Sequence, residues 1–158
     1  MVGTDPGGAN VFDTMREFFV RDDWHYEQAQ DLPILRMAFR GKSGRWLCIA
    51  RARDDAAQMM FYSVLDANVP EETRPAMAEF VARANYGLTI GNFELDFNDG
   101  EIRYKTSIDV ENNPASLADL IRNLVYINVN TMDKYFPGIM AVMYGGATST
   151  DALAKVEG

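Results

Sequence analysis

The chain has 158 residues, 47% hydrophobic and 11% aromatic, which suits one ordinary globular domain. Its 15 basic and 23 acidic side chains give a formal charge of −8, which opposes binding to a polyphosphate backbone and argues against nucleic acid as the main partner. The single cysteine, Cys48, excludes a disulfide within one chain, and residues 1–10 lack the basic and apolar character of a secretory leader, so we expect a cytoplasmic protein. The longest apolar run, residues 139–144, falls far short of the ~20 residues that span a bilayer, so no membrane protein is predicted.

The chain is predicted to begin with a helix and a short strand. Apolar residues recur at helical spacing over residues 11–21, directly after Asn10, which is a favourable N-cap. Residues 24–29 are a plausible short strand, closed by the loop that contains Pro33.

Residues 34–53 predict a β-hairpin. They alternate with period two around the loop Gly41-Lys42-Ser43-Gly44, and a four-residue loop suits a hairpin. The register that we expect sets Arg40 opposite Arg45, Phe39 opposite Trp46, Met37 opposite Cys48 and Leu35 opposite Ala50. One face of the hairpin is then apolar and the other is mixed.

A third long strand and a second helix follow. The strand is expected over residues 58–65, after a turn at Asp54-Asp55. The acids and prolines of residues 70–75 are typical of a helix entrance, and Gly87 lies where a left-handed C-terminal cap is expected. The inward side of this helix is predicted to consist of Met77, Phe80, Val81 and Ala84.

A second hairpin is predicted around Asp99-Gly100, because Asp-Gly between alternating apolar residues favours a two-residue type I′ turn. On the buried face, that turn sets Phe97 opposite Ile102 and Leu95 opposite Tyr104. On the other face, it pairs Asp96 with Arg103 and Glu94 with Lys105.

The last third of the chain predicts helices. A long helix is expected from Asn113-Pro114 toward Phe136, and Pro137 is expected to kink or end it before one or two further turns over residues 139–144. Residues 148–151 can cap a last short helix that runs through Val156.

Together these elements predict an α+β protein with an antiparallel sheet of about five or six strands covered by helices, in the order α-β-β-β-β-α-β-β-α. We expect one domain over residues 10–146, a flexible segment over 1–9 and a short C-terminal helix or tail over 147–158.

Residues suited to catalysis are scarce. His25 is the only histidine, which excludes a site built from several histidines, and Cys48 lies in an apolar strand where its thiolate is disfavoured. The paired acids all fall at the ends of predicted elements, where caps and turns account for them. We therefore expect no enzyme activity, no cofactor and no metal.

The first hairpin carries the clearest candidate for binding. Residues 33–53 contain six basic side chains and no acid, which leaves −14 for the rest of the chain. Arginines projecting from one face of this hairpin would offer forked donors to carboxylates of a peptide, a ligand or a second subunit. The candidate residues are Arg36, Arg40, Arg45, Arg51 and Arg53. A solvated face, or one neutralised by the chain's own acids, explains the same pattern.

The long C-terminal helix is the second candidate, because its apolar positions run nearly all the way round it. The sheet would cover one side, and a partner chain or other parts of the same chain would cover the rest. The residues that we expect on a partner or dimer surface are Tyr126, Val129, Asn130, Met132 and Tyr135.

Three segments resemble the YbjN family, described as bacterial sensory transduction regulators. They read RANYGL at 83–88, GNFELD at 91–96 and DGEIRYKTSID at 99–109. Flanking segments fit as well, and the resemblance extends over residues 11–146. It implies a fold similar to type III secretion chaperones, often dimeric, and it carries over no catalytic residues.

Such chaperones grip extended segments of a client protein, so the resemblance implies a non-catalytic, chaperone-like or regulatory binding module. We expect a homodimer with a protein client or regulatory partner. The alternative is a sensor that gathers a small anionic ligand on the arginine-rich face of the sheet.

Overall fold

The computed structural model describes residues 10–111 and 117–158. Its helices are α1 (Val11–Arg21), α2 (Arg74–Gly87), α3 (Leu117–Met143) and α4 (Ser149–Glu157). Its strands are β1 (Tyr26–Gln28), β2 (Ile34–Arg40), β3 (Arg45–Arg53), β4 (Gln58–Val64), β5 (Asn92–Leu95) and β6 (Ile102–Asp109). The predicted α+β class and element order are confirmed. The predicted flexible segment 1–9 and the helix start at residues 113–114 lie outside the described residues.

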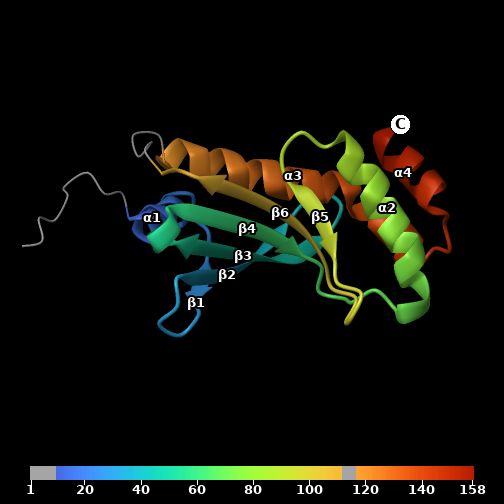
Figure 1. Cartoon of the computed structure of the whole chain (residues 1–158), viewed down its shortest axis with the longest axis horizontal. Coiled ribbons are helices and arrows are strands. Elements are labelled where there is room, and N and C mark those ends of the chain that lie inside the picture. The colour runs from blue at the N-terminus through green and yellow to red at the C-terminus, as the bar shows by residue number, and fades with distance from the viewer. Residues whose placement is uncertain (1–9, 112–116) are drawn as a thin grey trace, which may run out of the picture.

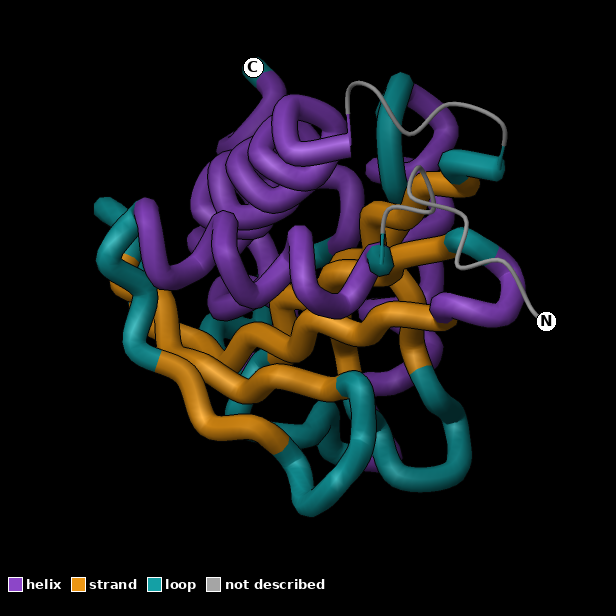
Figure 2. Tube along the Cα trace, turned by 90° about the vertical axis from the view of Figure 1, so that its left-hand side faces the viewer, coloured by secondary structure: helices purple, strands orange, loops and turns teal. Residues whose placement is uncertain are grey.

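The six strands form one antiparallel sheet in the order β1-β2-β3-β4-β6-β5. Figures 1 and 2 show α3 on one side of the strands, where it lies along β4 and β6, and Figure 1 shows α2 and α4 at the end of the sheet near β5. The main core lies between the helices and this covered face, where Phe19 of α1 stacks on Phe61 of β4 at 6.0 Å. Among the described elements, no helix packs on the opposite face of β2 and β3. The sheet therefore has a covered face and an open face.

The first hairpin has the predicted register. Arg40 lies opposite Arg45, and Met37 lies opposite Cys48. Because side chains alternate across a strand, Met37 and Cys48 point into the core while the arginines point to the open face.

The second hairpin differs from the prediction by two residues. Phe93 lies opposite Tyr104 and Leu95 opposite Ile102, so the turn is longer than the type I′ turn that we expected. Phe97 is therefore 56% exposed at the turn instead of buried. A shift of two residues keeps each strand residue on its face, so Tyr104 is still fully buried, as predicted.

The longer turn has a tertiary cause. Gly100 has a φ of 82°, and a side chain there would collide with the Val69 carbonyl. The Val69 amide donates to the Gly100 carbonyl at 2.8 Å. The glycine thus serves the close approach of the segment before α2, and it is not a residue of a two-residue turn.

One expectation about a helix end needs correction. Gly87 is the last helical residue of α2 and is followed by Leu88 in an extended conformation, while the left-handed glycine lies further on, at Gly91. Of the two outcomes expected at Pro137, an end of the helix is not seen, because α3 continues through it over the predicted further turns to Met143. The predicted caps are present, because the Asn10 and Thr148 side chains accept hydrogen bonds from the Asp13 and Asp151 amides.

A buried polar network fixes α3 on the sheet. The Asn128 amide nitrogen donates to the carbonyl oxygens of Phe61 at 2.9 Å and Tyr104 at 3.1 Å, and its oxygen accepts from Ser63 Oγ at 2.6 Å. The Trp46 indole donates to the same Ser63 oxygen at 2.9 Å. Since unpaired buried polar groups are costly, this network specifies where α3 lies over β3, β4 and β6.

Candidate binding face

The first hairpin, formed by β2 and β3, is held in place by contacts on the covered face of the sheet. The Asp133 carboxylate of α3 accepts hydrogen bonds from the backbone amides of Lys42 at 3.0 Å and Ser43 at 2.8 Å. Phe136, one turn further along α3, lies against Gly44 and packs on Trp46 with ring centroids 5.7 Å apart. The position of the hairpin tip is thus fixed by α3.

All five arginines that the sequence singles out lie exposed on the open face of β2 and β3. They are Arg36, Arg40, Arg45, Arg51 and Arg53. None of them forms a salt bridge within residues 10–111 and 117–158. Within those residues, Glu27 lies opposite Arg36 in the β1–β2 ladder without forming a salt bridge, and Arg40, Arg45, Arg51 and Arg53 have no acidic cross-strand partner in the sheet.

Two of these arginines are directly opposed. Arg40 and Arg45 face each other in the β2–β3 ladder, and like charges directly opposite in a sheet are destabilising. A carboxylate placed between them would turn this repulsion into charge-assisted hydrogen bonds. The arrangement therefore favours an anionic occupant.

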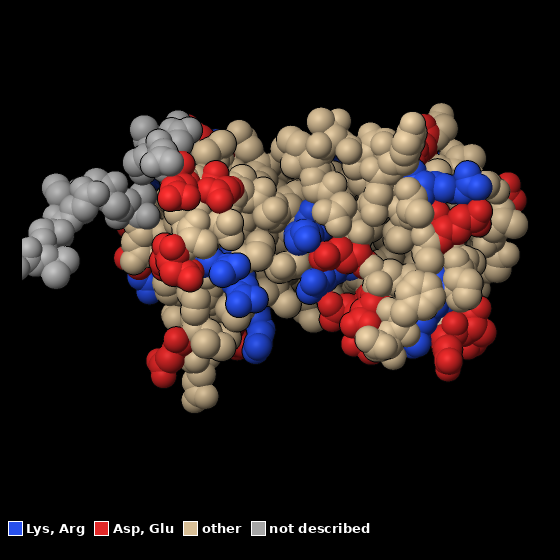
Figure 3. Space-filling model, viewed as in Figure 1, with Lys and Arg blue, Asp and Glu red and all other residues tan. Residues whose placement is uncertain are grey.

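The basic side chains of β6 behave differently. Arg103 contacts Glu94 at 2.9 Å and Glu101 at 3.7 Å, and Lys105 contacts Glu94 at 3.3 Å. The predicted partner of Arg103 was Asp96, and the two-residue shift of the hairpin gives that place to Glu94. Figure 3 shows basic side chains lying beside acidic ones in its view of the surface. The β6 side of the open face is thus neutralised, and the β2–β3 side is not.

Apolar side chains occupy the middle of the open face. Leu47 is 51% exposed, and it lies between Ala38 of β2 and Val64 of β4 in the ladder. In the next row, Ile49 lies between Arg36 and Tyr62. The guanidinium of Arg103, which is paired with Glu94, lies over the Tyr62 ring at 4.4 Å.

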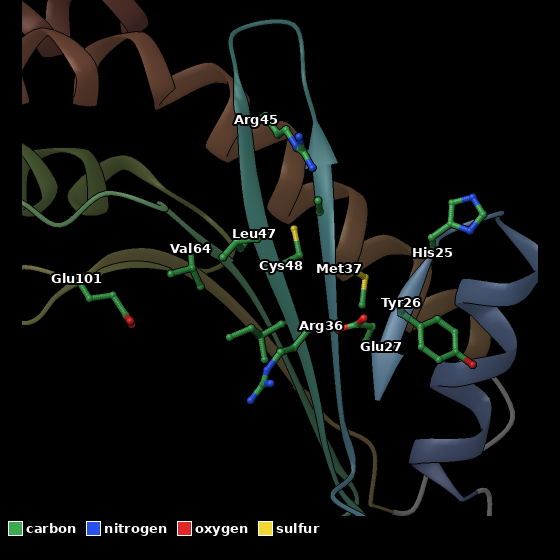
Figure 4. A pocket seen from close by; sticks show the side chains of 12 residues that line it. His25, Tyr26, Glu27, Arg36, Met37, Arg45, Leu47, Cys48, Val64 and Glu101 are labelled. Atoms are coloured by element: carbon green, nitrogen blue, oxygen red, sulfur yellow. The ribbon is translucent and has the colours of Figure 1, made fainter. Parts of the chain in front are cut away.

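A hollow of about 720 Å³ lies over these strands. Figure 4 shows side chains of its lining, which come from β1 to β4 and the segments beside them, with Arg36, Arg45, Leu47 and Val64 among them. We call this open face of β2, β3 and β4 the arginine face. It consists of the five arginines and of the apolar side chains Ala38, Leu47, Ile49, Tyr62 and Val64. The sequence did not predict that Tyr62 and Val64 belong to this face, because only the pairing of β4 with β3 places them beside Ile49 and Leu47.

Both His25 and Cys48 belong to the lining of the hollow, which is where a catalytic pair would be sought. The Cys48 side chain, however, is fully buried on the covered side, with its sulfur 3.9 Å from Ser63 Oγ. Burial raises the pKa of the thiol to about 12, which disfavours the nucleophilic thiolate. No group of three or more potential metal ligands occurs in the described part of the chain.

The helix residues predicted for a partner surface are mostly covered by the chain itself. Val129 and Met132 are fully buried and Tyr135 is 3% exposed, while Asn130 is exposed and Tyr126 is partly buried. Tyr135 packs on Phe93 and Phe80, and its hydroxyl donates to Glu157 of α4 at 3.2 Å. The apolar positions around α3 are thus explained by the sheet and by the other helices.

Comparison with known proteins matches residues 12–140 to the model of the YbjN family, described as "Putative bacterial sensory transduction regulator". The chain belongs to the YbjN family. No curated protein sequence matches it with significance. In the region that the structure describes, no helix is both long and apolar enough to cross a bilayer.

One solved structure shows the fold of this YbjN-family chain, and two others are similar to it with TM-scores below 0.5. The crystal structure of E. coli YbjN, described as a putative transcription regulator, is 13% identical with a TM-score of 0.54, covering 75% of this chain and 89% of its own. The Yersinia pestis type III secretion chaperone SycH, solved with a fragment of YscM2, is also 13% identical; its TM-score is 0.47, over 76% of this chain and 98% of its own. The structure of the HopA1–SchA chaperone–effector complex is 13% identical and has a TM-score of 0.39. The match covers 73% of this chain and 94% of that one.

Proposed function

We propose that this chain is a non-catalytic binding module that holds an acidic and partly apolar segment of another protein on its arginine face. The observation that carries the proposal is the unpaired, directly opposed Arg40 and Arg45 beside the exposed Leu47. Burial of exposed apolar side chains and pairing of unpaired guanidinium groups both favour such a segment. A regulatory role in the cytoplasm is part of the same proposal.

Family and fold agree with this proposal. The YbjN description is that of a regulator, and the SycH and SchA structures contain a bound protein or fragment. The buried, protonated thiol of Cys48 supports a role that does not depend on covalent chemistry.

Site-specific photocrosslinking tests the proposal. A photoreactive phenylalanine derivative replaces Leu47 on the arginine face or Leu32 in the loop before β2, and both positions are 51% exposed in the protein. We expect protein adducts from position 47 that disappear in the Arg40→Gln/Arg45→Gln variant, and none from position 32. Equal adducts from both positions, or adducts unaffected by the arginine changes, would contradict the proposal.

A homodimer remains a prediction. Val129 and Met132 are fully buried in a single chain, so a dimer would have to use other residues than the apolar ones that prompted the idea. Multi-angle light scattering of the full chain measures the assembly directly, and a mass of one chain at all concentrations would exclude the dimer.

The size of the hollow favours a second candidate, an anion sensor. Its volume of about 720 Å³ falls within the range of small-molecule sites, roughly 300–1,000 Å³. Arg36 and Arg45 line it together with the acids Glu27 and Glu101, so an anion would bind through the two arginines. In a thermal-shift screen of anionic metabolites, a ligand at 100 times its dissociation constant would add about 2.7 kcal/mol of stability. Shifts that persist in Arg36→Glu/Arg45→Glu would exclude this binding mode.

A further inference from the structure

The strands beneath the hollow have no free backbone amide or carbonyl groups with which an added strand could pair. β3 pairs with β2 on one side and with β4 on the other, and β4 pairs in turn with β6. The amide and carbonyl groups in the middle of the arginine face are therefore already used. An occupant must bind through its side chains, which excludes strand addition at this place.

The apolar stripe has the width of a helix. Ala38, Leu47 and Val64 lie side by side on three neighbouring strands. Because strands are spaced ~4.8 Å apart, this row spans roughly 10 Å, which is about the diameter of an α-helix with its side chains. Ile49 and Tyr62 continue the stripe in the next row along the strands.

The arginines lie at both ends of this stripe. Arg40 and Arg45 flank it where the hairpin turns, and Arg51 and Arg53 follow Ile49 along β3. At ~3.3 Å per residue, the stretch of β3 from Arg45 to Arg53 is roughly 26 Å long. A helix rises 1.5 Å per residue, so about 17 residues would reach from one pair of arginines to the other.

The covered face of the same sheet shows that this geometry accepts a helix. Helix α3 lies along β4 and β6 there and buries an apolar side against them (Figure 1). The strands present alternate residues to the two faces, so a helix on the arginine face would mirror α3 across the sheet. The two helices would differ in charge, because the arginines of the arginine face favour a helix with acidic residues.

We propose that the occupant of the arginine face is an acidic amphipathic helix of a partner protein, with an apolar stripe over Leu47 and Ile49 and carboxylates at both ends facing the two arginine pairs. This inference rests on the proposed function and specifies the form of the bound segment.

Two peptides of identical composition test the helical form. Both have about 17 residues of Leu, Glu, Ala and Gln, but one repeats Leu at helical spacing with Glu near both ends, and the other alternates Leu with polar residues at period two. Fluorescence anisotropy of the labelled peptides with the full chain gives the affinities. We expect the helical-pattern peptide to bind at least about tenfold more tightly and to gain helix, measured by circular dichroism, on binding.

Charge-matched variants test the site. Arg40→Gln/Arg45→Gln should weaken binding of the helical-pattern peptide at least about tenfold. Arg21→Gln/Arg122→Gln changes the net charge equally but alters exposed residues of α1 and α3, so it should leave the affinity within about twofold of the unaltered chain. Equal losses in both variants would show general charge attraction and overturn the inference.

The remaining outcomes separate this inference from the proposed function. Tighter binding of the period-two peptide would overturn the helical form while leaving segment binding intact. Absence of binding by the helical-pattern peptide up to about 1 mM would also overturn it. Missing photoadducts at position 47 would instead count against the proposed function itself.

Discussion

The two faces of one sheet obey different rules. On the covered face, apolar side chains fill the space under the helices, and no buried side-chain nitrogen or oxygen of the described residues lacks a hydrogen-bond partner. On the arginine face, Arg40 opposes Arg45 without an acid, and Leu47 is half exposed. Adjacent residues of the same strands thus lie on faces with different properties. Stability accounts for the covered face, whereas the unfavourable pairing on the arginine face calls for a functional explanation.

Thiol labelling should give the largest contrast between the faces. Cys48 is fully buried, and burial raises its pKa to about 12, so its thiol must wait for local or global opening before it reacts. In a Leu47→Cys/Cys48→Ala variant, the thiol lies one residue away but on the arginine face. We expect this thiol to react with an aromatic disulfide reagent at least about a thousandfold faster than Cys48. Comparable rates would show that the two faces are not distinct.

Two neighbouring methionines of β4 allow a matched test of stability. Met59 is fully buried on the covered face, and Met60 is partly exposed on the other. Met59→Ala should lower the free energy of unfolding by about 2–5 kcal/mol, because it leaves a cavity under the helices. Met60→Ala should cost less than about 1 kcal/mol. Urea unfolding measures both, and equal losses would contradict the assignment of faces.

Alkaline pH should lower the stability of the folded chain through Cys48, which lies on the covered face. The pKa of Cys48 is raised from 9.0 to about 12, mainly by burial, so the folded chain favours the neutral thiol. This contribution to stability is complete below pH 9 and is lost as the pH rises from 9 toward 12. We expect the unaltered chain to lose stability faster than Cys48→Ala over this range, by about 1.4 kcal/mol per pH unit. Parallel unfolding curves for the two proteins would show that the thiol ionises freely.

The smallest effect is expected from single charges on the arginine face. Arg45→Gln removes the repulsion with Arg40 and should stabilise the free protein by about 0.2–1 kcal/mol. Arg103→Gln removes the contact with Glu94 and should destabilise it by a similar amount. Thermal unfolding compares the two variants. Destabilisation by Arg45→Gln would reveal a structural role for Arg45 and weaken the functional reading of the opposed arginines.

The sequence was sufficient where local patterns and tertiary packing agree. The first hairpin has its predicted register, since period-two alternation and a four-residue loop set the same pairing. The five arginines could be placed on one face for the same reason. The second hairpin could not be predicted, because Gly100 is required by the approach of Val69, which lies far away along the chain. A local turn signal does not distinguish these two uses of glycine.

The rest of the site depends on strand order. β4 was predicted as a strand, but only its pairing with β3 places Val64 beside Leu47. Likewise, the apolar positions around α3 are equally consistent with a partner chain and with the chain's own helices, and only the positions of α2 and α4 decide between them. Sequence periodicity gives the face of a residue but not its neighbours across the sheet.

The edges of the sheet bear on self-association at high concentration. β1 has three residues and β5 has four, and β1 covers β2 only as far as Met37. Beyond Met37, pairing of β2 with a foreign strand is hindered by Trp24, which stacks on Phe39 at 5.4 Å, and by the charge of Arg40. Short edge strands and a charged residue at a free edge are the features that hinder strand-to-strand aggregation. At high protein concentration, both edges of this sheet therefore disfavour pairing with a strand of another copy.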